Sequence, residues 1–504
     1  MLEDLGLGLW HLTLALALIL GVVVLYKPDR DFVGVPTVKY SRYLPTFFNR
    51  VIFYAVGSKL IDEGYEKYRD TPFRILKADG DLIVLPAKYI NELRNVAPSE
   101  LSSLDAQYNN VLGKYTNVLV ESRLPSLTVA KRLNPAISRL VPSLIDELQY
   151  AFDIEVPKCD DKWTPVNAYN MLLGLLTRAT TRIICGDSIC RNEKWLETVT
   201  DYTINVGITV IFLRPFPKFL RPLVAKFLPS VRKLNKQVQF VKQELFIPMI
   251  NARHHAKKHN PSYQKPDDFL QWMIDGADNP RDADADFMAH NLFIIMSLAV
   301  VHTSSMLMTH MLYDLIEMPE YLEPLREEIQ ATLANGWTNA THSSFISQHH
   351  MDSFMKEVQR FNPTGEVSMH RIVRRPVILT DGLVLPVGAH ICFAAGPLSR
   401  DPKIIPDPTP FSGLRWSVNP EIKTNSFVSI GPHNMHFGFG RQACPGRFFA
   451  SVTIKAIMSR IIAEYEFKYE GERKERPANV RIGEQIMPNV GTNIVMRKRK
   501  GVVV

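Results

Sequence analysis

A single cysteine in a glycine-rich segment is the clearest candidate for chemistry in the sequence. Cys444 lies in the run Phe-Gly-Phe-Gly-Arg-Gln-Ala-Cys-Pro-Gly-Arg-Phe-Phe-Ala, residues 437–450, and an apolar stretch suited to a helix follows. At the start of a helix, the dipole and the N–H groups of a loop stabilise a thiolate, which is the metal-binding form of cysteine. For a lone cysteine, a buried residue in a turn is the ordinary alternative.

The spacing of other possible ligands narrows the kind of metal site. No Cys or His stands at zinc-like spacing from Cys444, which argues against a four-ligand structural zinc site. An iron that a macrocycle already holds needs only one axial protein ligand. Gly438, Gly440 and Gly446 would let backbone N–H groups approach the sulfur, and Pro445 suits the first turn of the following helix.

The whole segment resembles the haem-binding signature of the cytochrome P450 family, Phe-x-x-Gly-x-Arg-x-Cys-x-Gly. Phe437, Gly440, Cys444 and Gly446 fall in register with it. The resemblance implies that Cys444 is the axial thiolate ligand of a haem. Gln442 stands where the family usually has Arg, or His in fungal members. An amide can donate a hydrogen bond to a haem propionate, but it carries no charge.

A second candidate site lies in a long helix that the pattern predicts for Asp286 to Ile316. Its middle, 292–301, is almost wholly apolar, so it should pass through the core, and His-Thr-Ser-Ser follows at 302–305. Buried hydroxyls can bond the carbonyl four residues back and loosen the helix. By the resemblance, Thr303 binds dioxygen and relays protons. His302 could carry protons in place of the family's acid, or it could be a core histidine bonded to a carbonyl.

A Glu-x-x-Arg sequence supplies a third group of candidates. Glu357 and Arg360 share a helix face, and Pro363 ends that helix. An isolated pair of this kind is usually on the surface. By the resemblance, however, the pair forms a buried charged cluster with Arg415 and fixes the loop below the haem. Such burial is tolerable only in a mutually satisfied network.

Three further cations are candidates for contacts with the haem propionates. The resemblance places the predicted helix Pro125 to Glu147 at the haem edge, where Lys131 or Arg132 could meet a propionate. A solvated helix face is the alternative for both residues. Arg371 precedes a predicted hairpin, and the resemblance suggests a propionate contact there too.

The elements that must position these residues are mainly helical. Asp-Gly turns at 79–80 and 381–382 lie within the segments Phe73 to Leu85 and Val377 to Leu385, which predict two β-hairpins. Long helical patterns occupy most of the remaining chain, and no linker divides it. We therefore predict a mainly α fold with a small β region (α+β), the cytochrome P450 fold by resemblance, in one domain covering 28–504.

The N-terminus carries a candidate membrane anchor. Leu5 to Tyr26 is mainly apolar, and as a helix it would reach ~33 Å, which is enough to cross a bilayer core. No basic residues precede it and no clear cleavage site follows, so residues 1–27 are predicted to be an uncleaved anchor. Lys27 and Arg30 come just after the run and place the body of the protein in the cytosol.

Charge and composition limit the partners. The formal net charge of +8 favours an anionic partner surface. No nucleic-acid motif accompanies it, so membrane lipid or an acidic redox protein is the better interpretation. Phe212 to Pro222 interleaves aromatic residues with cations and prolines, a composition typical of a segment that dips into the lipid interface.

The resemblance implies a membrane-anchored haem-thiolate monooxygenase of the endoplasmic reticulum. It would use O₂ and electrons from NADPH–cytochrome P450 reductase, docked on the basic face near Cys444, to oxidise an apolar small molecule. A terpenoid or another fungal secondary metabolite is the predicted substrate class. Two alternatives remain open from the sequence. One is a haem-thiolate isomerase or dehydratase that needs no reductase, and the other is a non-enzymatic membrane interaction protein.

Overall fold

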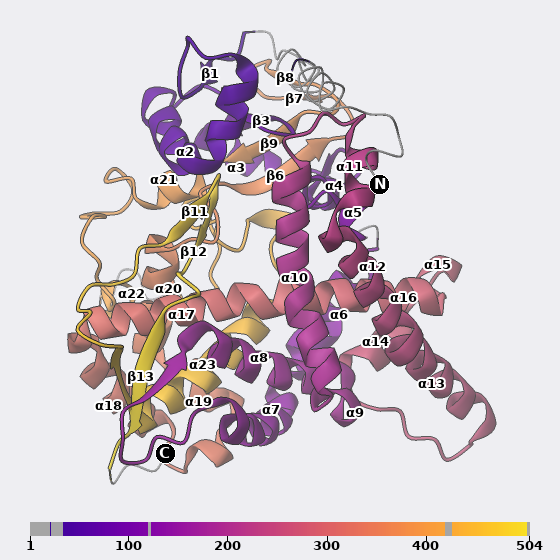
Figure 1. The fold of residues 1–504 in the computed structure, drawn as a ribbon, viewed down its shortest axis with the longest axis vertical. Coiled ribbons are helices and arrows are strands. Elements are labelled where there is room, and N and C mark those ends of the chain that lie inside the picture. Colours follow the sequence, from indigo (N-terminus) through magenta and orange to yellow (C-terminus); the bar gives the residue numbers. More distant parts are fainter. Residues whose placement is uncertain (1–20, 22–33, 119–121, 419–425, 501–504) are drawn as a thin grey trace, which may run out of the picture.

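The computed structural model describes residues 21, 34–118, 122–418 and 426–500. A large helical body and a smaller β-rich part make up the fold (Figure 1). The prediction of a mainly α protein with a small β region is confirmed. The predicted anchor, residues 1–27, lies outside the described residues except for Gly21.

The helices of the described residues follow one another along the whole chain. In the first half they are α2 (Thr46–Lys67), α3 (Ile90–Leu93), α4 (Ser103–Asn110), α5 (Gly113–Thr116), α6 (Leu124–Thr128), α7 (Asn134–Glu155), α8 (Ala168–Cys185), α9 (Asp187–Cys190), α10 (Glu193–Leu213), α11 (Arg221–Phe227), α12 (Pro229–Phe240) and α13 (Ile247–His259). In the second half they are α14 (Phe269–Gly276), α15 (Pro280–Ala283), α16 (Ala285–Ile294), α17 (His302–Glu317), α18 (Leu322–Thr332), α19 (His342–Ile346), α20 (His349–Phe361), α21 (Ala395–Ser399), α22 (Arg415–Val418) and α23 (Arg447–Glu464). Three π-helical segments join consecutive helices, namely η3 (Val129–Leu133), η4 (Val241–Phe246) and η5 (Ile295–Val301).

The strands form one larger sheet and three small ones. The six-stranded sheet has the order β1 (Thr37–Val38), β2 (Phe73–Lys77), β3 (Gly80–Leu85), β9 (His390–Phe393), β6 (Ser368–Val373), β4 (Leu101–Ser102). The three-stranded sheet has the order β10 (Tyr465–Tyr469), β13 (Asn493–Lys498), β5 (Thr164–Asn167). Two hairpins pair β11 (Val480–Ile482) with β12 (Gln485–Met487), and β7 (Val377–Ile378) with β8 (Val384–Leu385).

Both hairpins predicted from Asp-Gly turns are present. β2 and β3 pair antiparallel, and Lys77 faces Gly80 at the turn. β7 and β8 pair antiparallel with Val377 opposite Leu385. The parallel pairing of β3 with β9 joins the first hairpin to a strand about three hundred residues later in the sequence. The sheet therefore joins strands from the first hundred residues to strands between 368 and 393.

One long helix crosses the molecule. α16, η5 and α17 run without a break from Ala285 to Glu317, which confirms the helix predicted for Asp286 to Ile316. The side chain of Asp284 caps its start by accepting a hydrogen bond from the N–H of Phe287. Among the described residues this helix is long and apolar enough to span a membrane, but 67% of its most apolar window is buried inside the protein. It is therefore a core helix of this fold.

The main apolar core surrounds that helix. Side chains from α7, α8, α17, α20 and α23 belong to one buried cluster. α23, which begins just after Cys444, contributes residues such as Ile457 and Met458 that are 0% exposed. The cysteine segment is thus joined directly to the best-packed part of the molecule.

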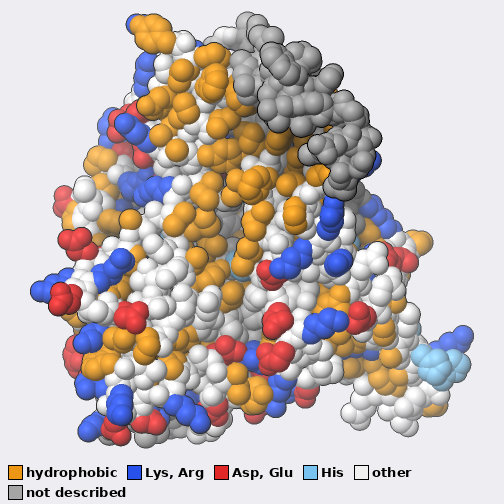
Figure 2. Space-filling view, viewed as in Figure 1, with side chains coloured by type: hydrophobic (Ala, Val, Ile, Leu, Met, Phe, Trp, Pro, Cys, Tyr) orange, Lys and Arg blue, Asp and Glu red, His pale blue; other side chains and the backbone are white. Residues whose placement is uncertain are grey.

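α10 lies across the front of the long helix in Figure 1. It carries apolar residues on its buried side and on its exposed side. Its buried side includes Trp195 and Tyr202. Its exposed side also carries apolar residues, namely Ile204, Ile208, Ile211 and Phe212. Figure 2 shows apolar side chains gathered in a band over this part of the surface.

Candidate functional site

The loop before α23 directs backbone N–H groups at the Cys444 sulfur. The N–H of Cys444 donates to the carbonyl of Phe437 over 2.8 Å and closes the loop. The N–H groups of Gly446 and Arg447, at the start of α23, hydrogen-bond to the sulfur. Cys444 is accessible to solvent, but the protein around it is dense, so burial raises the pKa of the thiol while these N–H groups lower it. A metal ion at the sulfur would complete the deprotonation.

Gly440 is held where no side chain fits. Its φ is +77°, and a Cβ built on it would lie 2.2 Å from the carbonyl oxygen of Arg94. The same carbonyl accepts the N–H of Arg441 over 3.0 Å. The cysteine loop therefore packs directly on the C-terminal end of α3. Gly446, by contrast, has open space at its Cβ position.

Gln442 contacts the protein backbone on both sides of its amide. Its Nε2 donates to the carbonyl of Leu101 over 3.0 Å, and its Oε1 accepts the N–H of Ser103 over 3.0 Å. The expectation that this amide serves a haem propionate is therefore corrected. Gln442 ties the cysteine loop to the junction of β4 and α4.

The long helix exposes two residues in its otherwise buried middle. Ala299 and Thr303 are exposed, whereas Met296, Val301 and Ser305 are buried. The Thr303 hydroxyl donates to the carbonyl of Ala299 over 3.0 Å. This is the i−4 bond that the sequence predicted, and it occurs where η5 replaces the α-helical hydrogen-bond pattern.

His302 points into the core between three helices. Its Nδ1 receives the hydroxyl of Tyr169 on α8 at 2.6 Å, and its Nε2 lies 2.9 Å from the carbonyl oxygen of Thr200 on α10. Burial lowers its pKa to about 4, so the ring is neutral near neutral pH. Both ring nitrogens are bonded within the protein, which disfavours the proton carrier among the two interpretations of His302 from the sequence. The contacts match the alternative of a core histidine bonded to a carbonyl.

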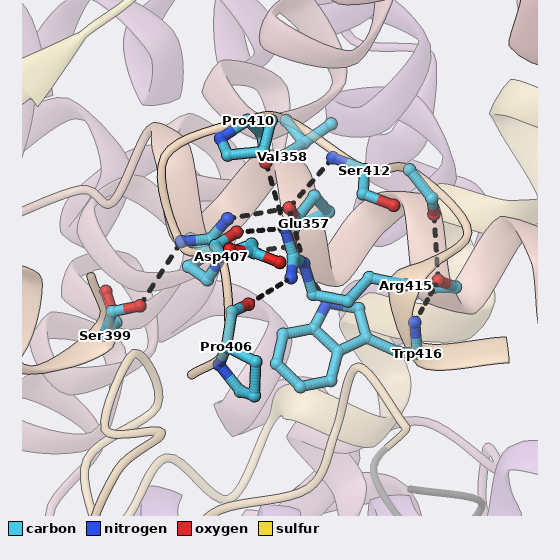
Figure 3. A network of polar contacts seen from close by, with 12 residues as sticks. Glu357, Val358, Ser399, Pro406, Asp407, Pro410, Ser412, Arg415 and Trp416 are labelled. Carbon is cyan, nitrogen blue, oxygen red and sulfur yellow. Dashed lines mark hydrogen bonds and ion pairs between the residues drawn. The ribbon is translucent and has the colours of Figure 1, made fainter. Parts of the chain in front are cut away.

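The structure brings Glu357, Arg360 and Arg415 together (Figure 3). The Arg360 guanidinium makes two bonds to the Glu357 carboxylate, of 2.7 and 2.9 Å. The Nε of Arg415 donates to the same carboxylate over 3.2 Å. Glu357 is 0% exposed and Arg360 is 2% exposed. This carboxylate is therefore fully enclosed between two cations.

Backbone groups and one aromatic side chain complete the cluster. The Nε1 of Trp416 and the N–H of Ser412 each donate to the Glu357 carboxylate over 3.1 Å. The remaining donors of Arg415 bond the carbonyls of Pro406, Asp407 and Pro410, each over 2.9 Å. One network therefore joins α20, α22 and the 406–412 loop (Figure 3).

The three cations predicted for propionates lie in two different settings. Arg371 is 5% exposed, and its guanidinium donates to the carbonyl of His370 over 2.8 Å. Burial lowers its pKa to about 10, with no opposing contribution from a carboxylate among the described residues. Lys131 and Arg132 are exposed in η3. They lie beside the cysteine loop, because the amide of Asn134 donates to the carbonyl of Pro445 over 3.0 Å.

Sequence reasoning missed the partners that are distant along the chain. Trp416 was not singled out, although it directly follows Arg415. Tyr169 and Thr200 belong to different helices from His302, and nothing in their local sequence marks the contact. Only the packing of α8 and α10 on the long helix brings them to the ring.

The residues present fit a haem. The Cys444 sulfur has backbone donors that stabilise a thiolate. Ala299 and Thr303 offer a small exposed strip on a buried helix. In the described residues, no three His, Cys, Asp or Glu side chains are grouped to hold a metal ion by themselves. The donor set thus suits an iron that arrives in a macrocycle.

Comparisons with known proteins agree with this donor set. The family model for cytochrome P450 matches residues 133–493. The chain is 47% identical over 480 residues to cytochrome P450 monooxygenase janP of Penicillium janthinellum, covering 95% of this chain and 93% of that protein. It is 46% identical over 494 residues to cytochrome P450 monooxygenase paxP of Penicillium paxilli, with 97% and 95% covered. It is also 46% identical over 474 residues to cytochrome P450 monooxygenase AtmP of Aspergillus flavus, with 94% and 91% covered. The chain therefore belongs to the cytochrome P450 family, and it is a haem-thiolate monooxygenase.

Proposed function

We propose that Cys444 is the axial ligand and that the enzyme inserts one oxygen atom from O₂ into an apolar small molecule. A terpenoid or related fungal secondary metabolite is the proposed substrate class, and the similarity to monooxygenases of Penicillium and Aspergillus supports it. The observation that carries the ligand assignment is the pair of N–H groups, from Gly446 and Arg447, on the Cys444 sulfur. They lower the energy of the charged sulfur that haem iron requires.

A thiolate-bound haem supplies activation of O₂ and oxidation of an unactivated C–H bond, with two electrons drawn from NADPH through a reductase. One oxygen atom enters the substrate and the other leaves as water. Cys444 binds the iron, and the N–H groups of Gly446 and Arg447 hold its charge. Arg371 offsets negative charge at the site, and Thr303 presents a hydroxyl that holds a proton at Oγ1.

The ligand assignment is tested by Cys444→Ala. We expect the variant to lose the thiolate-haem band in the reduced carbon-monoxide difference spectrum and to lose NADPH-dependent turnover. Cys190→Ala is the matched control, because Cys190 is a buried cysteine on α9, away from the loop. Normal thiolate spectra in Cys444→Ala would overturn the assignment.

The substrate class is tested with extracts of a strain that lacks the enzyme. The purified full chain, the reductase and NADPH are added under isotopically labelled O₂. We expect an apolar compound to be consumed and to gain one labelled oxygen atom. Consumption without NADPH, or a product without the label, would contradict a monooxygenase reaction on that compound.

The role of Thr303 is tested by Thr303→Val, with Thr309→Val as control. Both hydroxyls donate to the carbonyl four residues back, but Thr303 is exposed and Thr309 is 0% exposed. We expect Thr303→Val to divert electrons from product to hydrogen peroxide, by roughly tenfold or more. Thr309→Val should leave the ratio of product to peroxide unchanged. Equal ratios in both variants would remove Thr303 from the proton path.

We also propose that the reductase docks beside the cysteine loop on Lys131, Arg132 and Arg441. All three are exposed, and an acidic partner would gain in association rate from them. Reversing both charges in η3, with Lys131→Glu and Arg132→Glu, should slow reduction by NADPH and reductase by about tenfold, with haem content unchanged. Lys257→Glu on α13 is the control. Loss of haem in the η3 variant would instead favour the propionate role.

Finally, we propose that residues 1–27 anchor the chain in the endoplasmic reticulum membrane with the domain, 28–504, in the cytosol. The cations that follow the apolar run support this orientation. The exposed apolar residues of α10 and α11 support a second contact with lipid.

A further inference from the structure

The π-helical segment in the long helix accepts a hydrogen bond from a neighbouring helix. η5 replaces i→i+4 bonds with i→i+5 bonds over Ile295–Val301, and such a segment costs energy unless its carbonyls are satisfied. The hydroxyl of Thr203 on α10 donates to the carbonyl of Ser297 over 2.7 Å. The neighbouring helix therefore bonds η5 from the side.

A second bond joins α10 to the residue that follows η5. A carbonyl oxygen can only accept, so the Nε2 of His302 carries the proton and donates to Thr200 over 2.9 Å. The Nδ1 then accepts the hydroxyl of Tyr169 over 2.6 Å. The ring is 4% exposed, and it links α17 to both α8 and α10.

The two bonds from α10 span one π turn. Thr200 and Thr203 are three residues apart on α10, about one α-helical turn. Their partners, His302 and Ser297, are five residues apart, which is the spacing of a π-helical hydrogen bond. α10 is thus hydrogen-bonded to the long helix at both ends of this turn. The turn contains Ala299 and directly precedes Thr303.

We propose that His302 and Thr203 are positioning residues that clamp this π turn and so fix the placement of the exposed Thr303 hydroxyl. If α10 moved, the two hydrogen bonds would shift the π turn and with it the Thr303 hydroxyl. This inference rests on the haem-thiolate site but not on the identity of the substrate. It gives His302 a role in orientation that needs no change of protonation.

The surroundings of the ring agree with a fixed, neutral histidine. Tyr169 is the titratable group in contact with it, and burial raises the pKa of that phenol well above its usual value. From α10, the ring meets the backbone carbonyl of Thr200. Burial lowers the pKa of His302 to about 4.

Three substitutions separate clamping from proton transfer. His302→Gln keeps a donor and an acceptor but does not titrate. His302→Leu removes both bonds, and Thr203→Val removes only the bond to Ser297. Thr198→Val is the matched control, because Thr198 lies on the same helix and its hydroxyl bonds the carbonyl of Lys194 in its own helix.

Hydrogen exchange of the full-length haem protein is the first measurement. In His302→Leu and Thr203→Val, we expect amides of 295–306 to exchange about tenfold faster or more, since a buried hydrogen bond is lost. His302→Gln and Thr198→Val should match the wild type. Unchanged exchange in both His302→Leu and Thr203→Val would overturn the clamp. If His302→Leu does not fold, Thr203→Val alone decides.

The pH dependence of NADPH oxidation with added reductase is the second measurement. Between about pH 5.5 and 8.5, we expect wild type and His302→Gln to give the same profile. A wild-type inflection that His302→Gln abolishes would show proton transfer through the ring and would overturn the positioning role. Because these readouts need no substrate, their failure is distinct from failure of the proposed substrate class.

Discussion

At the scale of single residues, two glycines of the cysteine loop meet different surroundings. Gly440 has a positive φ and the Arg94 carbonyl against its Cα, whereas Gly446 has a negative φ and free space. The requirement for glycine at Gly440 is steric. At Gly446 the backbone N–H bonds the sulfur, and any residue other than proline would keep that donor.

Gly440→Ala should therefore destabilise the loop and Gly446→Ala should not. The added methyl at Gly440 meets backbone at 2.2 Å and in a left-handed conformation, so we expect a loss of at least about 2 kcal/mol of stability. Haem content and chemical unfolding measure the effect. A Gly440→Ala protein as stable as Gly446→Ala would contradict the packing described for Arg94.

His302 should make the protein sensitive to acid. Its pKa falls from 6.5 in the unfolded chain to about 4 in the fold, so the unfolded state binds more protons between these values. Stability linked to His302 is present above pH 6.5 and is lost as the pH falls to about 4, by about 3 kcal/mol. The slope of unfolding free energy against pH reports how many more protons the unfolded state binds. His302→Gln should lower that number by up to one in this window. An unchanged slope would mean that the buried ring is already charged.

The residues that the sequence predicted best are those whose environment is local. The loop and helix start around Cys444 were predictable because the glycines and the apolar run stand next to it in the chain. Gln442 and His302 were assigned different roles, because their bonds go to Leu101 and Thr200, far away in sequence. Hydrogen bonds across the fold leave no local pattern, so the direction of an amide or an imidazole could not be inferred.

At the scale of elements, the Glu357 carboxylate connects segments that have little regular structure. Between α21 and α22, carbonyl groups of the chain accept hydrogen bonds from Arg415. Arg415 in turn donates to the Glu357 carboxylate. α20 thus supports the 406–412 loop through a single acidic side chain (Figure 3). The side-chain network thus fixes this loop by hydrogen bonds, as backbone hydrogen bonds fix the strands of a sheet.

Glu357→Ala should therefore lower the stability of the protein much more than Trp416→Phe does. Removing the carboxylate leaves the buried Arg360 and the part-buried Arg415 without a counter-charge, which costs about 3–5 kcal/mol. Trp416→Phe removes one hydrogen bond to the same carboxylate, at a cost of about 1–2 kcal/mol. Haem retention after gel filtration and urea unfolding give the comparison. Equal losses would mean that the charges are not what supports the loop.

Element types were predictable where the pattern was strong. Asp-Gly turns within alternating segments gave both hairpins, and a long apolar run gave the helix from Ala285 to Glu317. The π-helical character of η5 could not be inferred from the local pattern, which is apolar throughout 292–301. The bond from Thr203 to the carbonyl of Ser297 comes from another helix, and the local sequence does not mark it.

At the scale of the whole molecule, exposed apolar residues collect on one region. Phe212, Leu223 and Phe227 on α10 and α11 are 59%, 56% and 70% exposed, and apolar side chains are dense in that part of Figure 2. Lys218 and Lys226 accompany them and are exposed. This combination suits the interface of an anionic bilayer.

A fluorescent label can test that contact in the full-length chain in nanodiscs. With Phe227→Cys carrying an environment-sensitive dye, we expect a blue shift and quenching by lipid-soluble quenchers. Ile346→Cys is the control, because Ile346 on α19 is also 53% exposed. The native cysteines other than Cys444 are buried and should not label. Equal emission from both positions would contradict lipid contact at α11.

The cysteine loop is completed by contacts with residues that are synthesised much earlier, because Arg441 and Gln442 bond to the carbonyls of Arg94 and Leu101. A ribosome has produced most of the polypeptide before it reaches the codon for Cys444. The nascent protein thus offers no complete cradle until residues 437–447 have been made, although earlier parts can already fold. Haem insertion has to follow their synthesis, and in a haem-poor cell the apoprotein is the species that chaperones and proteases encounter.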